Sequence, residues 1–324
     1  EDFFVRAPLK SGPGAGGSLE ANDNRVELIT EPETLEIGII PAAQFLKSAK
    51  VQDHPAADFM RLDGYCLHLY LCLQEKSRQL NLNTEEAVGL IRNAFNEGVA
   101  DLVQLEMASC GERDRGFSQA APLVQSIKKN FRTFVAWAGI PPEDFGVIDS
   151  FYAAGVDLIV LPLKGTSGEA PNPPSKQGMK MLEYAAGVFG PGTVRTELAL
   201  NPGAIAPLLE QITALTQQGI LPCITLPEGA FQQPDVLEQV RQVAGHLERS
   251  AQKEKLNLKW LYPSGGWFSP LDASFYTRDR RSARLAQRPV FQSTLGKTAT
   301  EGFAALRRKL RIKNISDSYE SAGL

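Results

Sequence analysis

The sequence lacks the cysteine spacings that mark metal sites and disulfide scaffolds. Its 324 residues contain 4 cysteines, and no two of them stand in a C-x2-C arrangement. Cysteines this sparse and irregular argue against a secreted disulfide framework. The sequence also lacks a signal peptide and any apolar stretch of about 20 residues, the length that a membrane-spanning helix needs. We therefore expect a cytoplasmic protein with reduced thiols and no membrane partner.

A strong excess of charge is absent as well. The chain has 34 Lys and Arg against 37 Asp and Glu, a net charge of −3, which gives no reason to expect a nucleic-acid partner. No predicted strand is followed by a G-x-G-x-x-G or Walker A phosphate loop, which disfavours a nucleotide-binding open sheet. The composition, 43% apolar and 22% charged, is typical of a soluble globular protein.

What the sequence does contain is a repeated unit of a short apolar run, a turn and an amphipathic helix pattern. Near-continuous apolar runs such as 158–161 are typical of parallel strands covered on both faces. Six consecutive strand–helix units with right-handed crossovers form either a doubly wound sheet or a barrel. Without phosphate loops we predict the barrel: an α/β fold with a partial parallel TIM barrel of six βα units. The strands are expected at 64–72, 101–107, 132–138, 157–163, 193–200 and 220–226, and the helices from 84, at 118–130, from 141, and at 176–188, 204–217 and 233–252.

Four segments divide the chain. Residues 1–24 include a Gly-rich and Ser-containing run and are predicted to be a flexible lead-in. Residues 25–63 form a small strand-containing module, 64–252 the barrel, and 253–324 an irregular C-terminal extension that packs on the barrel. Aromatic residues gather at 260–276 in this extension. They either bind a protein partner, since interface cores are rich in aromatic residues, or cap the core of the barrel.

Three short stretches carry a resemblance to a known family. They are AAGVD at 153–157, VFGPGTVR at 188–195 and GILP at 219–222. In this order they resemble the strand-four, strand-five and strand-six regions of the radical S-adenosylmethionine superfamily, in particular its biotin-synthase-like and lipoyl-synthase-like branches. The resemblance covers about residues 64–230 and implies a partial barrel with its site at the carboxyl ends of the strands.

The resemblance implies a cofactor site that lacks one part. The family binds a 4Fe-4S cluster through three cysteines in the loop after the first strand, whereas loop 73–82 reads LQEKSRQLNL, so no iron–sulfur cluster is expected. S-adenosylmethionine is a possible cofactor, with Gly111, Glu112, Arg195 and Asn201 as its contacts. The function implied is that of a pseudoenzyme: a cluster-free barrel that binds a small molecule, serves an active paralogue as partner subunit, or catalyses non-radical chemistry.

The residues also support an alternative, an ordinary TIM-barrel lyase or aldolase. Lys164 directly follows the fourth predicted strand, where a lysine can bind a carboxylate or form a Schiff base. Arg195 and Glu197 alternate on the fifth strand and share one face, and Glu106 on the second strand can join them across the interior. Charged residues on an apolar strand need partners. Lys164 and Glu197 are the catalytic candidates of this hypothesis.

The sequence does not predict a metal site. His68, Cys72 and Cys110 can meet near the barrel mouth, and thiolate and imidazole ligands suit zinc or iron. Free cysteines, however, are commonly small buried apolar residues. Cys223, within the sixth strand, is expected in the core.

Overall fold

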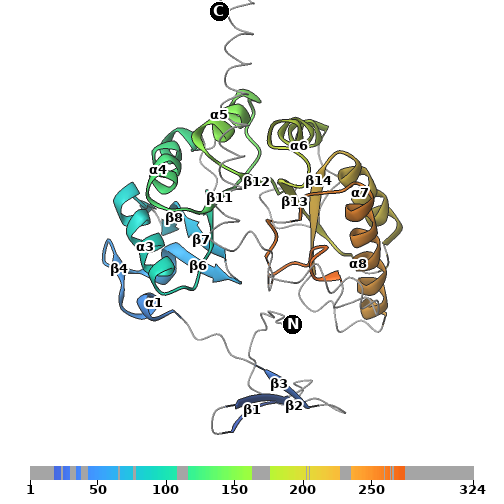
Figure 1. Ribbon diagram of the computed structural model, residues 1–324, viewed down its shortest axis with the longest axis horizontal. Coiled ribbons are helices and arrows are strands. Elements are labelled where there is room, and N and C mark those ends of the chain that lie inside the picture. The colour runs from blue at the N-terminus through green and yellow to red at the C-terminus, as the bar shows by residue number, and fades with distance from the viewer. Residues whose placement is uncertain are drawn as a thin grey trace, which may run out of the picture.

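The computed structural model describes most of the barrel region and parts of the segments around it. The residues described are 18–22, 25–29, 34–37, 43–64, 66–75, 78–107, 116–162, 176–201, 203, 205–226, 235–258, 260–262, 264 and 266–273. Their main body is a curled seven-stranded sheet with an arc of helices along its outer side (Figure 1). No helix within these ranges is both long and apolar enough to span a bilayer.

Six strands of the main sheet run parallel and lie side by side in chain order. They are β7 (Cys66–Tyr70), β10 (Leu102–Glu106), β11 (Phe134–Ala138), β12 (Leu158–Val160), β13 (Val194–Ala199) and β14 (Ile220–Thr225). β6 (Met60–Asp63) pairs antiparallel with β7. Among the described strands β6 and β14 stand at the two ends of this order, so the sheet is a half-barrel. The predicted partial TIM barrel is confirmed.

A helix follows each parallel strand, as the repeat predicts. They are α3 (Thr84–Asn96), α4 (Phe117–Asn130), α5 (Gly146–Ala154), α6 (Lys176–Phe189), α7 (Ile205–Gln217) and α8 (Val236–Lys253). Asn83 caps α3 in a capping box: its side chain accepts from the Glu86 N–H, and the Glu86 carboxylate accepts from the Asn83 N–H. The expected start of α5 at residue 141 is wrong, because Asp144 accepts from the Gly146 N–H in a turn before the helix begins.

Alternation along the strands divides the apolar side chains between two cores. Side chains such as Leu67, Leu105, Trp137 and Ile159 point outward and belong to the large core that includes the helices. The intervening residues face the concave side of the sheet, as the two-residue period of a strand requires. There a smaller cluster forms from Cys66, Leu102, Phe134, Ala136 and Leu158 together with Trp260 and Tyr262.

The described C-terminal residues 256–258, 260–262, 264 and 266–273, which we call the strap, cover this concave side. Phe268 and Ile224 of β14 exchange two backbone hydrogen bonds of 2.8 Å, and the Trp260 ring packs edge-on against Phe134 with the ring centres 4.2 Å apart. Trp260, Tyr262 and Phe268 are all buried. Within the described residues these aromatics therefore cap the chain's own core. Phe275 and Tyr276 lie outside the described residues.

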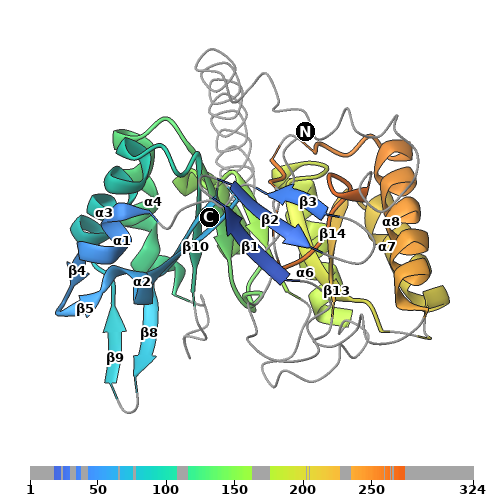
Figure 2. The same ribbon diagram turned by 90° about the horizontal axis from the view of Figure 1, so that it is seen from below.

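Smaller elements lie before and beside the half-barrel. β1 (Ser18–Asn22), β2 (Arg25–Ile29) and β3 (Thr34–Ile37) form an antiparallel sheet of their own. α1 (Gln44–Ser48), the β4 (Lys50–Val51) and β5 (His54–Pro55) pair and α2 (Ala56–Phe59) precede β6. After β7 the chain forms a hairpin of β8 (Cys72–Glu75) and β9 (Arg78–Asn81), which projects from the body in Figure 2.

We predict that Gly192→Ala destabilises the fold by roughly 2 kcal/mol or more. Gly192 has φ +80, and a Cβ there would stand 2.7 Å from the backbone O of Asn257 and also strike its N. The substitution both strains the turn before β13 and pushes the strap away. Urea denaturation followed by circular dichroism measures the loss.

Gly187→Ala is the matched control. Gly187 lies on the exposed side of α6 with nothing within 4 Å of an added Cβ, so alanine there raises helix propensity and stabilises the fold by up to about 1 kcal/mol. Equal stabilities for the two variants would contradict the tight contact at Gly192.

Candidate active site

Polar side chains form a connected group on the concave face. They come from four strands of the sheet: Arg61 on β6, His68 on β7, Gln104 and Glu106 on β10, and Arg195 on β13. The first three strands are adjacent, and β13 lies beyond β11 and β12. His68 pairs in register with Gln104, which places the two side chains side by side. His68 is only 1% exposed and Arg195 only 3%. Polar groups buried this deeply need partners, and the strap supplies one of them.

His68 and Glu106 form an ion pair at the centre of the group. The Glu106 carboxylate bonds to Nδ1 of His68 and lies 3.7 Å from the Arg61 guanidinium. Burial opposes the charge of His68, but hydrogen bonds and charge interactions with Cys66 and Glu106 outweigh it and raise the pKa of His68 to about 9. Burial likewise opposes the charge of Glu106, yet His68 and Arg61 lower the pKa of its carboxyl below the usual value. Both groups are therefore charged at neutral pH.

Gln104 connects this pair to Arg195. Its amide oxygen accepts from the Arg195 guanidinium at 2.8 Å, and its amide nitrogen donates to Glu106 at 3.3 Å. The Tyr262 hydroxyl of the strap lies 3.1 Å from Nε2 of His68 and 3.5 Å from the Gln104 oxygen. Since Nδ1 of the charged ring donates to the carboxylate, Nε2 donates to the tyrosine oxygen. Arg195, Gln104, Glu106, His68 and Tyr262 are thus one network.

Arg195 is a buried cation with one donor left over. Its guanidinium lies 5.4 Å from the centre of the Tyr262 ring and 5.6 Å from that of the Trp267 ring. Burial opposes its charge, but its surroundings, Tyr262 and Cys223 foremost, raise the pKa of Arg195 above its usual value. Its Nε has no hydrogen-bond partner in the described structure. A buried N–H without an acceptor is costly, so this atom is a candidate contact for a ligand.

A cavity of about 20 Å³ lies beside Arg195. This space is enough for one water molecule. Its lining combines sheet and strap residues: Gln104, Val160, Arg195, Thr196, Glu197, Cys223, Tyr262 and Trp267. Burial raises the pKa of the Cys223 thiol to about 12, which keeps it neutral and excludes it as a thiolate nucleophile. The prediction that Cys223 belongs to the core is confirmed, since its side chain is buried.

The structure brings some predicted residues together and leaves others apart. Arg195 and Glu197 line the same cavity, and Glu106 reaches Arg195 through Gln104 rather than directly. Asn201 lies exposed after β13, outside the lining of this cavity. Lys164, Gly111 and Glu112 fall outside the described residues, so their proposed roles stay predictions.

The metal alternative gains no support from the described part of the chain. Both ring nitrogens of His68 are taken up by Glu106 and Tyr262, and Cys72 begins the β8–β9 hairpin. Cys110 lies outside the described residues. Within them, no three His, Cys, Asp or Glu side chains gather in a way that could hold a metal ion.

Two members of the network were missed by sequence reasoning. Gln104 sits at i−2 from Glu106 in the strand LVQLE, so the two-residue period already places both on one face, and this signal was available. Tyr262 had no such signal, because the irregular strap has no period that fixes where its hydroxyl points.

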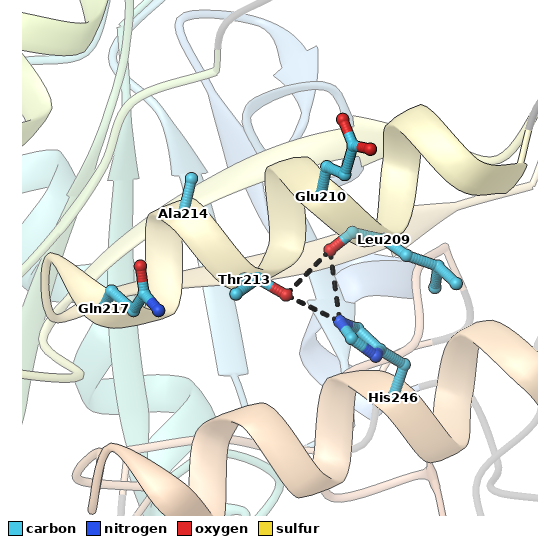
Figure 3. A pocket seen from close by; sticks show the side chains of 6 residues that line it. All are labelled: Leu209, Glu210, Thr213, Ala214, Gln217 and His246. Carbon is cyan, nitrogen blue, oxygen red and sulfur yellow. Dashed lines mark hydrogen bonds between the residues drawn. The ribbon is translucent and has the colours of Figure 1, made fainter.

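A second hollow lies on the outer helical layer, between α7 and α8 (Figure 3). It measures about 330 Å³ and is lined by Leu209, Glu210, Thr213, Ala214, Gln217 and His246. The Thr213 hydroxyl donates to the Leu209 carbonyl at 3.0 Å, so Nε2 of His246 donates to Thr213 at 2.8 Å. Burial lowers the pKa of His246. This histidine therefore joins two helices as a neutral side chain, and the hollow is an open groove.

Comparisons with known proteins give no family. No protein-family model matches the sequence, and no curated protein is similar to it. Three of the solved structures with some likeness are a Schiff-base-forming fructose-1,6-bisphosphate aldolase (17% identity, 55% of this chain and 69% of that one, TM-score 0.33), an HpcH/HpaI aldolase from Desulfitobacterium hafniense (12%, 60% and 76%, 0.33) and a dihydropteroate synthase from Coxiella burnetii (10%, 71% and 94%, 0.32). At these identities and TM-scores the likeness assigns no activity to this chain.

The predicted kinship with the radical S-adenosylmethionine superfamily, including its biotin-synthase-like branch, is wrong. The structures found to resemble the chain include aldolases and dihydropteroate synthases. The segment that the resemblance equated with a cluster-binding loop is the paired hairpin β8–β9. The resemblance was misleading because alternating strands and helices with Gly at the helix ends are common to βα barrels in general.

The His68–Glu106 pair predicts a loss of stability at alkaline pH. The folded-state pKa of His68, about 9, lies above its unfolded value of 6.5. Its contribution is therefore complete below pH 6.5 and disappears as the pH rises through 9, a loss on the order of 3 kcal/mol. Urea denaturation at several pH values between 6 and 10 measures this slope.

Glu106→Gln removes the carboxylate charge that, together with the interactions of Cys66, raises the pKa of His68, so the slope should become shallower in this variant. His246→Gln is the control, since His246 lies in the outer groove, and it should keep the slope of the parent protein. Parallel pH profiles for the parent and Glu106→Gln would show that the pair does not hold the proton.

Proposed function

We propose that the chain is an ordinary TIM-barrel enzyme of the lyase or aldolase type, which breaks or forms a carbon–carbon bond in a small molecule at the concave site. One observation carries the proposal: the buried cation Arg195 and the carboxylate Glu197 line the same interior cavity. A retro-aldol cleavage needs a base to remove a proton and a positive group to stabilise the enolate that forms. This pair provides both.

The reaction can be written with these two residues. Glu197 accepts the proton of a hydroxyl group β to a carbonyl, and the bond between the α and β carbons breaks as the hydroxyl carbon becomes an aldehyde or ketone. The electron pair of that bond moves into an enolate, whose oxygen Arg195 holds by hydrogen bonds. The enolate carbon then takes back the proton from Glu197, and both products leave with the enzyme unchanged.

The other polar residues position Arg195. Gln104 accepts from the Arg195 guanidinium. Glu106, which is paired with the charged His68, accepts from the amide nitrogen of Gln104 and so fixes the orientation of that amide. Since a guanidinium fixed in advance costs no reorganisation during the reaction, this network supports electrostatic stabilisation of the enolate.

Lys164 offers a covalent version of the same reaction class. Its amine would condense with the substrate carbonyl, release water and form an iminium ion that accepts the electron pair in place of Arg195. Lys164 follows β12 in the sequence and lies outside the described residues, so only the Arg195 and Glu197 route is supported by contacts in the described structure. S-adenosylmethionine binding and a protein partner stay predictions that neither route requires.

The test is cleavage of a panel of β-hydroxy carbonyl compounds, with the released aldehyde or ketone measured directly. We expect turnover by the parent protein and a decrease in kcat of about a hundredfold or more in Glu197→Gln, because general-base catalysis contributes about 10² to 10⁴ in rate. Glu210→Gln, an exposed acid on α7, should leave kcat unchanged.

Borohydride trapping with mass spectrometry separates the two routes. A covalent adduct on Lys164 favours the Schiff-base route, whereas cleavage without any adduct favours Arg195 and Glu197. Lys180→Arg, an exposed position on α6, controls for adventitious labelling. Absence of both turnover and adduct across the panel would refute the lyase proposal.

A further inference from the structure

We propose that the interior site takes the carboxylate of a short oxo or hydroxy acid, which Arg195 holds once Trp267 of the strap has moved off the guanidinium. This inference rests on the proposed function, since it names the substrate class of the same site.

Arg195 has the hydrogen-bond donors that a carboxylate needs. A guanidinium presents several N–H donors in a planar fork that matches the two oxygens of a carboxylate. In this structure one arm donates to Gln104, while the buried Nε has no partner in the described residues. A carboxylate oxygen at Nε would satisfy that donor and compensate the buried charge. The aromatic faces that now cover the guanidinium provide cation–π contacts but no hydrogen-bond acceptor for Nε.

The spacing of Arg195 and Glu197 limits the size of the ligand. Arg195 and Glu197 are two residues apart on β13, so their side chains leave the same face of the strand about 6.6 Å apart. A molecule that places its carboxylate at Arg195 and a hydroxyl or carbonyl group within reach of Glu197 has a chain of only a few carbons. A larger substrate would have to displace Val160 or Cys223, which belong to the sheet.

A carboxylic acid can reach Arg195 only if a wall of the cavity moves. A cavity of about 20 Å³ holds a water molecule but no carboxylic acid. Six of its eight lining residues lie on strands, and the other two, Tyr262 and Trp267, lie on the strap. Tyr262 is fixed by its hydrogen bond to His68, whereas Trp267 is only partly buried and follows the exposed Gly266. Trp267 is therefore the lining side chain that moves to admit the ligand.

The displaced contact has an energetic consequence. The cation–π contact between the buried Arg195 and the Trp267 ring stabilises the covered state, and an incoming carboxylate must replace it. Removing the Trp267 ring in advance should therefore tighten carboxylate binding by about threefold to tenfold.

Isothermal titration of the full chain with sodium pyruvate tests this, against sodium chloride at matched ionic strength. We expect Trp267→Ala to bind pyruvate about threefold to tenfold more tightly than the parent, with no such change for chloride. Leu258→Ala is the matched control: Leu258 also lies in the strap and, like Trp267, packs against the cluster of Leu221 and Leu256. It does not line the cavity beside Arg195, so the substitution loosens the strap without uncovering Arg195 and should leave affinity unchanged.

Arginine dependence is tested in the Trp267→Ala background. Arg195→Lys keeps a positive charge without the fork and should weaken pyruvate binding at least tenfold. If that variant does not fold, phenylglyoxal labelling of Arg195 in Trp267→Ala replaces it, and pyruvate should slow the labelling. Equal affinity of the parent and Trp267→Ala, absence of millimolar binding in both, or labelling unaffected by pyruvate would overturn the inference.

Binding and cleavage fail separately in these experiments. Arginine-dependent pyruvate binding without turnover of any β-hydroxy carbonyl compound would refute the lyase proposal and leave the carboxylate site standing. Turnover together with pyruvate binding that is insensitive to Arg195 would do the reverse.

Discussion

The half-barrel depends on the packing of the strap against the concave face of its sheet. A full parallel barrel buries its inner side chains against one another, but the six parallel strands of the described sheet would by themselves leave Phe134, Leu158 and their neighbours uncovered on the concave face. Trp260 and Tyr262 complete this cluster, and the Phe268 backbone pairs with Ile224 at the edge of β14. Within the described residues, the strap thus does what further strands do in a full barrel: it completes the inner core and pairs with the edge of β14.

The same contact determines why polar residues are stable inside the sheet. A buried imidazolium, carboxylate and guanidinium each carry a large desolvation cost unless every group finds a partner. Glu106 compensates His68 and Arg61, Gln104 links the carboxylate to Arg195, and Tyr262 accepts from His68. Without the strap, water would replace Tyr262 and raise the local dielectric constant. The electrostatic attraction between these charged groups would then be weaker.

Periodicity determines what the sequence alone could predict. All six strand–helix units follow from apolar runs and helix-start signals such as Asn83 with Glu86, and the shared face of Arg195 and Glu197 follows from strand alternation. The position of Tyr262 did not follow, because an irregular segment gives no rule that relates spacing to direction. The family resemblance failed for a related reason: the stretch VFGPGTVR records a turn before a buried strand, with Gly192 against the strap, and such a turn reflects packing rather than cofactor chemistry.

The strap can serve both stability and access because its anchors are separate from the residue that covers Arg195. Trp260 and Phe268 are buried on either side of the partly buried Trp267, and Ser264 donates to Asp63 at 2.6 Å between them. Local openings cost least where few buried contacts break. Moving Trp267 breaks its contacts with Arg195 and Tyr262, while the anchors keep the concave core closed. A carboxylate that supplies Arg195 with the acceptors it now lacks would offset that local cost, so binding selects an open strap without unfolding the half-barrel.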